Sequence, residues 1–297
     1  MQRATQWIAV TLLLAGCPTR SLAQTAAPAA PVTSERKLTV SAGYEAHRDR
    51  TRYEFENPSN FDTSFLVPHR FVQTYVADNQ WLVVSARYPG FGDVLETEVG
   101  LTPHKTTFAS DLDTFFNPND DVIVAGTAGD VSMYSWRFAQ WSQSRLWGVP
   151  FRVGFVYRRD ESEFHSTERL VTHSNPPSET RTPISTHETT ISQGRELSIG
   201  VSRDVAIAPR WLLTAGVDVA PLVVASLTTV LPEKYPGQDI VFQARAAGLT
   251  TRLELARRRT RWPVAVALGY GRTWSYSPAS RFGRDTLQFG VRLGIQP

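Results

Sequence analysis

The last part of the sequence alternates strictly between apolar and polar residues. From residue 287 to residue 296 every second side chain is apolar, and glycine, glutamine or arginine stands between. The apolar set is Leu287, Phe289, Val291, Leu293 and Ile295. Because successive side chains of a β-strand point to opposite faces, a period of two predicts a strand with one apolar and one polar face. The same alternation over residues 151–158 and in other segments predicts an all-β protein.

The connections between the expected strands differ in length. Short turns are expected at residues 103–104, 208–210 and 260–262, whereas residues 171–193 are rich in Ser, Thr and Pro and are expected to form a long exposed loop. Short turns on one side and long loops on the other are typical of transmembrane β-barrels, in which the short turns are periplasmic and the long loops extracellular.

A closed barrel follows from the chemistry of lipid. No backbone N–H or C=O can stay unpaired in the bilayer, and a closed ring of strands has no free edge. The predicted fold is therefore a closed antiparallel transmembrane β-barrel of ten strands. Twelve strands are the alternative, if residues 71–77 and a kink at Pro89-Gly90 form an extra hairpin. A soluble β-sandwich is the rival architecture, since its strands alternate too.

The N-terminal segment has the features of an export signal. Arg3 precedes an apolar run at residues 7–15, and Ser21-Leu22-Ala23 offers the small residues that a signal peptidase reads. The expected segments are a signal peptide (1–23), a flexible periplasmic leader (24–35) and the barrel (36–297). Cys17 leaves a lipoprotein alternative open, because residues 14–17 resemble a lipobox. Both routes predict export through the inner membrane to the bacterial outer membrane.

The basic residues are almost all arginine. The chain has 31 Lys and Arg residues and a net charge of +3, and only Lys37, Lys105 and Lys234 are lysines. Guanidinium groups pair bidentately with phosphate, which suits a surface covered by lipopolysaccharide. Outer-membrane lipid and lipopolysaccharide are therefore the expected partners, and nucleic acid is not expected for an exported chain. No metal-ligand spacing or phosphate-binding loop occurs, so neither a metal nor another cofactor is expected.

The polar faces of the strands are predicted to fill the lumen. A ten-stranded barrel is narrow enough for inward side chains to occupy its interior, which argues against free diffusion. The charged residues expected inside are Glu96, Glu98, Arg152, Arg158, Arg245 and Arg292. Trp141 and Trp147 are expected in an aromatic girdle at the membrane interface. A small pore remains as a third function if the barrel has twelve or more strands.

Two aspartates, Asp111 and Asp113, form the most informative local motif. Residues at i and i+2 of a strand point the same way, so the two carboxylates are expected side by side near a strand end. Crowded carboxylates can share a proton or position a water. We therefore take Asp111 and Asp113 as candidate catalytic residues. The alternative is that they are ordinary solvated residues at a strand end.

The motif Asp111-Leu112-Asp113, followed by Asn117-Pro118, resembles the omptins. Omptins are ten-stranded outer-membrane proteases in which an Asp-x-Asp pair on one rim faces an Asp-x-His pair across a groove. The resemblance extends in pattern from about Trp81 to the C-terminus. It implies an omptin-like barrel, a peptide substrate and an aspartic-type endopeptidase activity.

The second half of the omptin site is not matched. The positions that correspond to its Asp and His hold Pro232 and Lys234. Proline has no acid function, and a lysine cation cannot act as a neutral general base. Glu233 could substitute in part, while the histidines of the 165–187 region are expected to be solvated. Two functions stay open: a surface endopeptidase with an altered or degenerate site, and a non-enzymatic surface barrel for adhesion, ligand binding or envelope structure.

Overall fold

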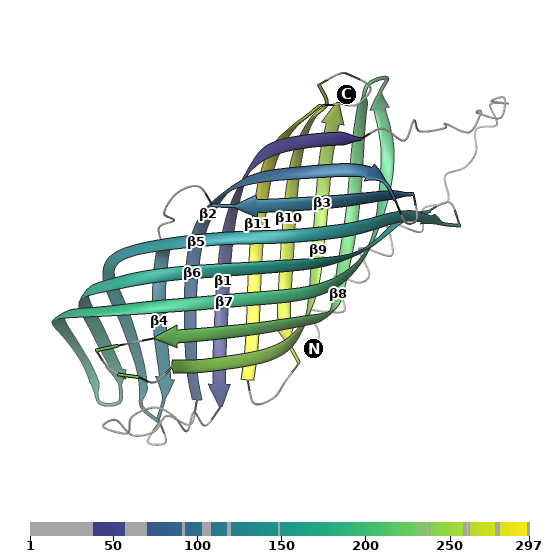
Figure 1. Ribbon diagram of the computed structural model, residues 1–297. Coiled ribbons are helices and arrows are strands. Elements are labelled where there is room, and N and C mark those ends of the chain that lie inside the picture. Colours follow the sequence, from purple (N-terminus) through teal and green to yellow (C-terminus); the bar gives the residue numbers. More distant parts are fainter. Residues whose placement is uncertain are drawn as a thin grey trace. The chain divides into compact units, whose positions relative to one another are not determined.

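The chain forms one β-barrel (Figure 1). The computed structural model describes residues 38–56, 70–90, 93–102, 108–117, 120–147, 149–230, 232–233, 236–237, 239–257, 260, 262–276 and 280–295. The predicted signal peptide, leader and Cys17 alternative lie outside these residues and stay predictions. In the described part of the chain, no helix is long and apolar enough to cross a membrane.

The described strands pair into one antiparallel ring. They are β1 (Thr39–Glu56), β2 (Arg70–Pro89), β3 (Val94–Leu101), β4 (Phe108–Phe116), β5 (Val122–Leu146), β6 (Val149–Ser174), β7 (Pro177–Ala208), β8 (Trp211–Val230), β9 (Asp239–Arg257), β10 (Val264–Ser275) and β11 (Ser280–Ile295). Strands β1 and β11 pair, and β1 also pairs with β2, so the sheet closes on itself. The predicted all-β closed barrel is confirmed.

Strands β3 and β4 share one position in the ring. Both pair with β2 on one side and with β5 on the other, β3 along residues 82–89 of β2 and β4 along residues 70–77. The ring therefore has ten positions, which confirms the prediction of ten strands. The turn predicted at residues 103–104 lies outside the described residues, and the strands on either side of it, β3 and β4, run in the same direction. The chain reverses after Pro89, between β2 and β3.

The long loop predicted at residues 171–193 is wrong. Strands β6 and β7 continue through it as a paired hairpin and turn only at Asn175-Pro176. The segment is polar on both faces, which hides the alternation, but its threonines are β-branched and suit a strand. We call the end of the barrel with this turn the tip end. The end where β1 begins and β11 finishes is the base end.

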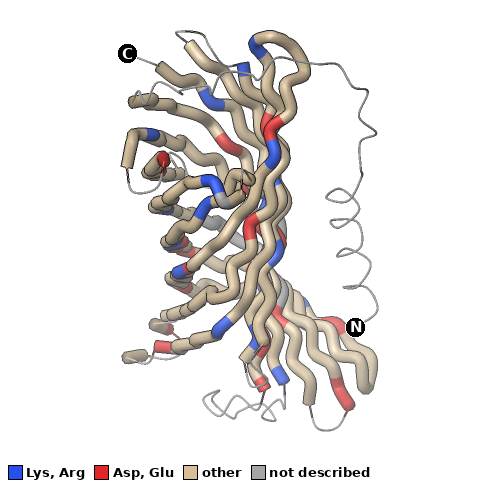
Figure 2. Tube along the Cα trace, turned by 90° about the vertical axis from the view of Figure 1, so that its right-hand side faces the viewer, with Lys and Arg blue, Asp and Glu red and all other residues tan. Residues whose placement is uncertain are grey.

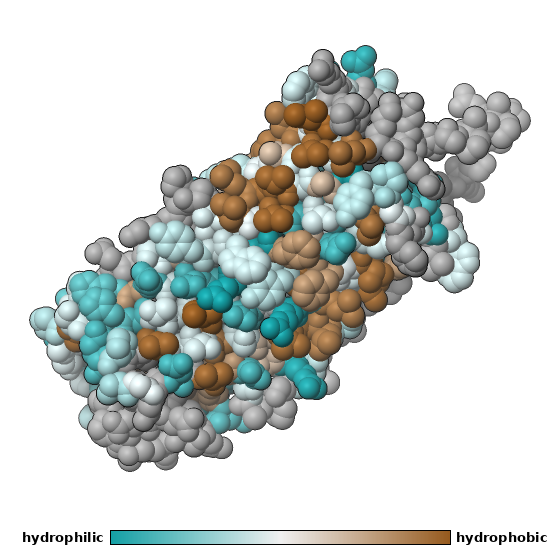
Figure 3. Space-filling view, in the orientation of Figure 1, coloured by the Kyte–Doolittle hydropathy of each residue, from teal (hydrophilic) through white to brown (hydrophobic). Residues whose placement is uncertain are grey.

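The outer face of the barrel carries a band of exposed apolar side chains. Members on three strands are Leu197, Ile199 and Val201 of β7, Val219, Leu222 and Val224 of β8, and Leu287, Phe289, Val291 and Leu293 of β11. In Figure 3 the hydrophobic colour gathers on the part of the visible surface toward the base end, and hydrophilic residues cover much of the part toward the tip end. An outward apolar band with a polar interior is the pattern of a barrel in lipid.

Charged side chains fill the lumen behind this band. Glu45 is 1% exposed and binds Arg137 and Arg292 at 2.5 and 2.6 Å, and the same two arginines reach Glu98 at 2.8 and 2.7 Å. Trp81 is fully buried, with the Arg137 and Arg158 guanidinium carbons 5.3 and 5.1 Å from its ring centroid. In Figure 2 acidic and basic residues are intermixed over much of the barrel wall.

All but one of the charged residues predicted to lie in the lumen belong to this network. Five of them make ion pairs or hydrogen bonds inside the barrel: Glu96, Glu98, Arg152, Arg158 and Arg292. Arg245 is exposed and lies between the buried Ala244 and Ala246, so it faces outward. Trp141 is not in the girdle either, because the Arg152 guanidinium stacks 4.2 Å from its ring inside the lumen. Trp147 is 93% exposed.

Candidate functional site

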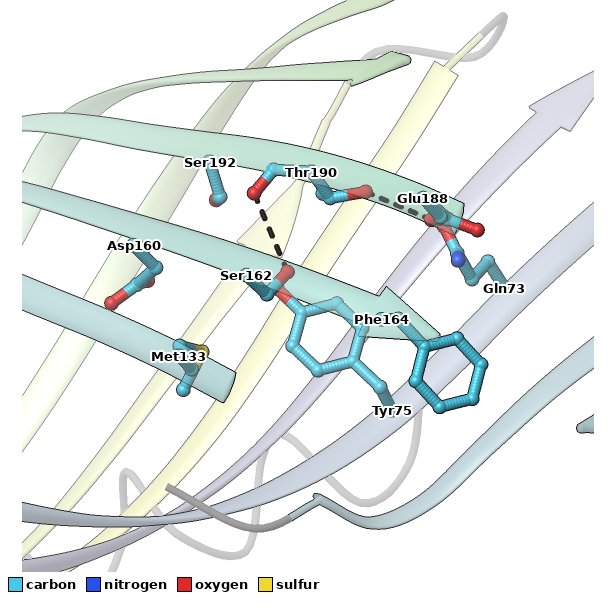
Figure 4. Close-up of a pocket in the computed structure, with 9 residues that line it drawn as sticks. All are labelled: Gln73, Tyr75, Met133, Asp160, Ser162, Phe164, Glu188, Thr190 and Ser192. Carbon is cyan, nitrogen blue, oxygen red and sulfur yellow. Dashed lines mark hydrogen bonds between the residues drawn. The ribbon is translucent and has the colours of Figure 1, made fainter. Parts of the chain in front are cut away.

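A pocket lies in the lumen on the tip side of the charged network (Figure 4). The empty space in and in front of it, part of which is open to solvent, is about 480 Å³. Alternate residues of four strands line it, because the alternation turns every second side chain inward. They are Gln73 and Tyr75 of β2, Met133 of β5, Asp160, Ser162 and Phe164 of β6, and Glu188, Thr190 and Ser192 of β7.

Hydrogen bonds along β7 hold one wall of the pocket. The Thr190 hydroxyl donates to Glu188 Oε1 at 2.8 Å and lies 3.0 Å from the hydroxyl of Thr229. Ser192 shares a 2.8 Å hydrogen bond with the buried Tyr53 hydroxyl. The Glu188 carboxylate is therefore fixed in place at the pocket wall.

Asp160 joins the pocket to the charged network below it. Its two oxygens pair with Arg158 at 2.9 Å and with Arg284 at 3.0 Å, and Arg158 also reaches Asp49 at 2.6 Å. The two arginines neutralise Asp160. This carboxylate therefore belongs to the closed floor of the pocket, whereas Glu188 belongs to its wall.

The predicted aspartates lie on β4, next to this pocket. Asp113 stands opposite Gln73 of β2 and Ala125 of β5. Directly opposed residues of an antiparallel pair share a face, so Asp113 shares the lumen face with Gln73. The backbone of Asp111 pairs with Tyr75, and its side chain lies outside the described part. Their catalytic role stays a prediction.

Glu233 and two histidines form a cluster on the outer face. The Glu233 carboxylate accepts hydrogen bonds from the His187 backbone N–H at 3.2 Å and pairs with His187 Nδ1 at 2.9 Å. The His187 ring stacks on His165 with centroids 4.5 Å apart. Their chain neighbours Glu188 and Phe164 line the pocket, so this cluster points away from it. The expectation that Glu233 partly replaces the missing omptin pair across the groove is therefore wrong.

An Asp–His pair lies on the lumen face at the tip end. His173 Nδ1 is 2.8 Å from Asp121 Oδ2, and the backbone N–H groups of Ser174 and Asn175 donate to Asp121 Oδ1 at 3.0 Å. The hydrogen bond with His173 and those from the backbone hold the pKa of Asp121 below its usual range.

The strand register places His173 inward. It stands opposite Ile123, which stands opposite Phe115, which in turn stands opposite the buried Phe71. A β-bulge near residues 166–168 shifts the alternation, so odd-numbered residues of β6 face the lumen beyond it. Sequence reasoning missed this pair because Asp121 and His173 are 52 residues apart and no local pattern predicts the bulge. In the described part of the chain, no group of three or more His, Cys, Asp or Glu is placed to hold a metal ion.

Comparisons with known proteins show the fold. No family model matches the chain, and no curated protein does. The outer membrane protease OmpT from Escherichia coli has a similar structure, with a TM-score of 0.65 and 8% identity over 89% of this chain and 98% of that chain. The translocator domain of the autotransporter NalP from Neisseria meningitidis reaches a TM-score of only 0.32 at 11% identity, over 88% of each chain. The chain thus has an omptin-like outer-membrane β-barrel fold.

Proposed function

We propose that the protein is a surface barrel of the bacterial outer membrane that binds a ligand in its tip-end pocket without cleaving it. The omptin-like fold and the outward apolar band support the membrane location. The tip end is then extracellular, because the long β6–β7 hairpin projects from it, while β1 begins and β11 finishes at the base end.

The observation that carries this proposal is the filled lumen beneath an ordered pocket. The pocket ends on Asp160, whose arginine partners belong to the network around the buried Asp49 and Trp81. A concave site with a few fixed polar groups and a closed floor suits ligand binding better than conduction.

The chemistry of the pocket favours binding over hydrolysis. General-base catalysis of peptide hydrolysis is most efficient when the pKa of the base lies near the working pH, as that of a histidine does. Among the described residues that line the pocket none is a histidine, and Glu233 points to the outer face.

A surface endopeptidase with an altered site is the second candidate. Asp113 lies beside the pocket wall, and the His173–Asp121 pair shares its lumen face. An aspartate that holds Nδ1 of a histidine leaves Nε2 available to accept a proton from water. The fold likeness to OmpT, whose name describes a protease, is consistent with this candidate.

Lipopolysaccharide is the proposed lipid partner. On the outer face of the tip half, Arg52, Arg70 and Arg281 surround Glu54 at 3.0, 2.8 and 3.4 Å, and two of the three arginine side chains are half exposed. Arg281 also pairs with Glu56 at 3.1 Å, so three guanidinium groups face two carboxylates, and the excess can bind phosphate as well. Refolding the protein with and without lipopolysaccharide tests this partner, because the lipopolysaccharide phosphates are the groups that these arginines would bind.

A peptide-cleavage assay decides between the two functions. The refolded barrel is incubated with a peptide library in detergent and lipopolysaccharide, beside the variants Asp111→Ala/Asp113→Ala and His173→Ala. We expect no cleavage above the rate of the double variant. Cleavage by the wild type that either variant abolishes would establish the endopeptidase and overturn the binding proposal.

A further inference from the structure

We propose that the tip-end pocket binds a sugar ring, an inference that rests on the proposed function. The pocket combines aromatic and aliphatic surface with a row of hydrogen-bonding groups on fixed strands. A sugar ring presents C–H groups on its faces and hydroxyls around its edge, so it can use both kinds of surface at once.

The apolar part of the pocket offers a platform for a ring face. Tyr75 reaches in from β2 and Phe164 from β6, and Figure 4 draws both rings at the pocket. Tyr75 is held from behind by Tyr53, whose ring stacks 6.1 Å away at an interplanar angle of 27°. A fixed aromatic face supplies contact area at little cost in side-chain entropy.

The polar part offers partners for hydroxyl groups. Glu188, Thr190 and Ser192 follow one another along the inward face of β7, and the Gln73 amide of β2 lines the same pocket (Figure 4). The carboxylate and hydroxyl oxygens accept from sugar hydroxyls, and the amide N–H₂ of Gln73 donates to them. Because Thr190 already holds Glu188 Oε1 at 2.8 Å, the carboxylate is oriented before a ligand arrives.

Two other ligand classes fit the pocket less well. A small cation could contact Glu188, but the other carboxylate of the pocket, Asp160, is already neutralised by Arg158 and Arg284, so the pocket does not offer the several charged oxygens that a cation site uses. An aromatic hydrocarbon would fill the apolar part but leave the β7 hydroxyls and carboxylate facing carbon, which costs free energy for each polar group so desolvated. A polyhydroxylated ring satisfies both halves of the pocket.

Calorimetric titration of the refolded barrel tests the sugar class directly. The detergent is lauryldimethylamine oxide, because a glycosidic detergent would itself compete for the site. The probes are glucose, galactose, mannose and N-acetylglucosamine, with butylammonium and benzene as representatives of the rival classes. Variants Glu188→Gln and Phe164→Ala alter the pocket. Glu163→Gln is the matched control, because Glu163 is next to Phe164 in the sequence but is exposed on the outer face.

At least one monosaccharide should bind saturably. We expect Glu188→Gln and Phe164→Ala each to weaken its binding by about tenfold or more, and Glu163→Gln to leave it unchanged. Heat-modified migration on gels confirms that each variant is folded. If no monosaccharide binds but butylammonium or benzene binds in a pocket-dependent way, the sugar class is wrong and the binding function stands. If none of the six probes binds, both proposals fail.

Discussion

At the scale of single residues, Asp121 connects two parts of the chain at the tip end. It precedes β5 and accepts hydrogen bonds from the backbone of Ser174 and Asn175, while its other oxygen contacts His173. The Ser174 hydroxyl in turn accepts from the Val122 N–H at 2.7 Å. One carboxylate thus fastens the β6–β7 turn to the start of β5, although these segments are some fifty residues apart.

The substitution Asp121→Asn should loosen this turn. The asparagine side chain has one carbonyl oxygen, so it cannot accept from the backbone and from His173 with both oxygens as the carboxylate does. We expect faster hydrogen exchange at the Ser174 and Asn175 amides. Asp120→Asn is the control, because the neighbouring Asp120 is exposed and asparagine tolerates its positive φ of 61°. Equal exchange in the two variants would remove Asp121 from this role.

The Glu233–His187 contact predicts a pH dependence of the β8–β9 connection. Hydrogen bonds from His187 hold the pKa of the Glu233 carboxyl below the ordinary value of 4.5. A lowered pKa means that the contact stabilises the fold fully above pH 4.5 and is lost as the pH falls through the lowered value. We expect protection of the His187 amide to decrease over that acidic range, after correction for intrinsic exchange. In Glu233→Gln the protection should no longer depend on pH there, and an unchanged profile would contradict the assignment.

At the scale of elements, the contact between β5 and β6 depends on glycine at position 154, which has no side chain to collide with Trp141. A Cβ atom on Gly154 would overlap the Trp141 ring and come within 2.7 Å of the Gln140 carbonyl oxygen, whereas a Cβ on Gly194 would meet nothing within 4 Å. We expect Gly154→Ala to lower the free energy of unfolding by about 1–3 kcal/mol. Gly194→Ala should change it by less than about 0.5 kcal/mol or stabilise slightly. Urea titration in lipid vesicles measures both, and equal values would mean that Trp141 does not pack against β6 as described.

The elements also show what the sequence can and cannot predict. The strands follow from alternation where one face is apolar, as in β11, where every second residue faces out. The tip half of β6 and β7 has no such contrast, because both of its faces are polar, so the sequence predicts a loop there instead of strands. Arg245 shows the related error in register, since a shift of one residue moves a side chain to the other face.

The candidate site, like the fold, is only partly predictable from the sequence. The sequence predicts that Asp113 lies on a strand, and its place opposite Gln73 agrees with that. The pocket itself joins residues of β2, β5, β6 and β7 that lie far apart in the chain, and the inward turn of His173 depends on a bulge. Such non-local contacts have no signal in a single sequence.

At the scale of the whole molecule, the filled lumen predicts that the barrel does not conduct ions. Glu45, Trp81 and Asp49 are all at most 1% exposed and join strands on several sides of the ring through their partners. We expect no steady open-channel conductance from the refolded protein in planar bilayers. A stable conductance step for each inserted barrel would mean that the network opens, and the small-pore alternative would then apply.

The orientation of the barrel is the central claim, because it makes the pocket accessible from outside the cell. The chain has one cysteine, Cys17, in the predicted signal segment, so single cysteines can be introduced elsewhere as markers. Thr180→Cys places a thiol at the exposed tip end and Arg210→Cys places one in the exposed β7–β8 turn at the base. In intact bacteria that produce the protein, a membrane-impermeant maleimide should label the Thr180→Cys variant at once. It should label the Arg210→Cys variant only after the outer membrane is permeabilised. Labelling of the base-end cysteine alone, or of both equally in intact cells, would contradict the account.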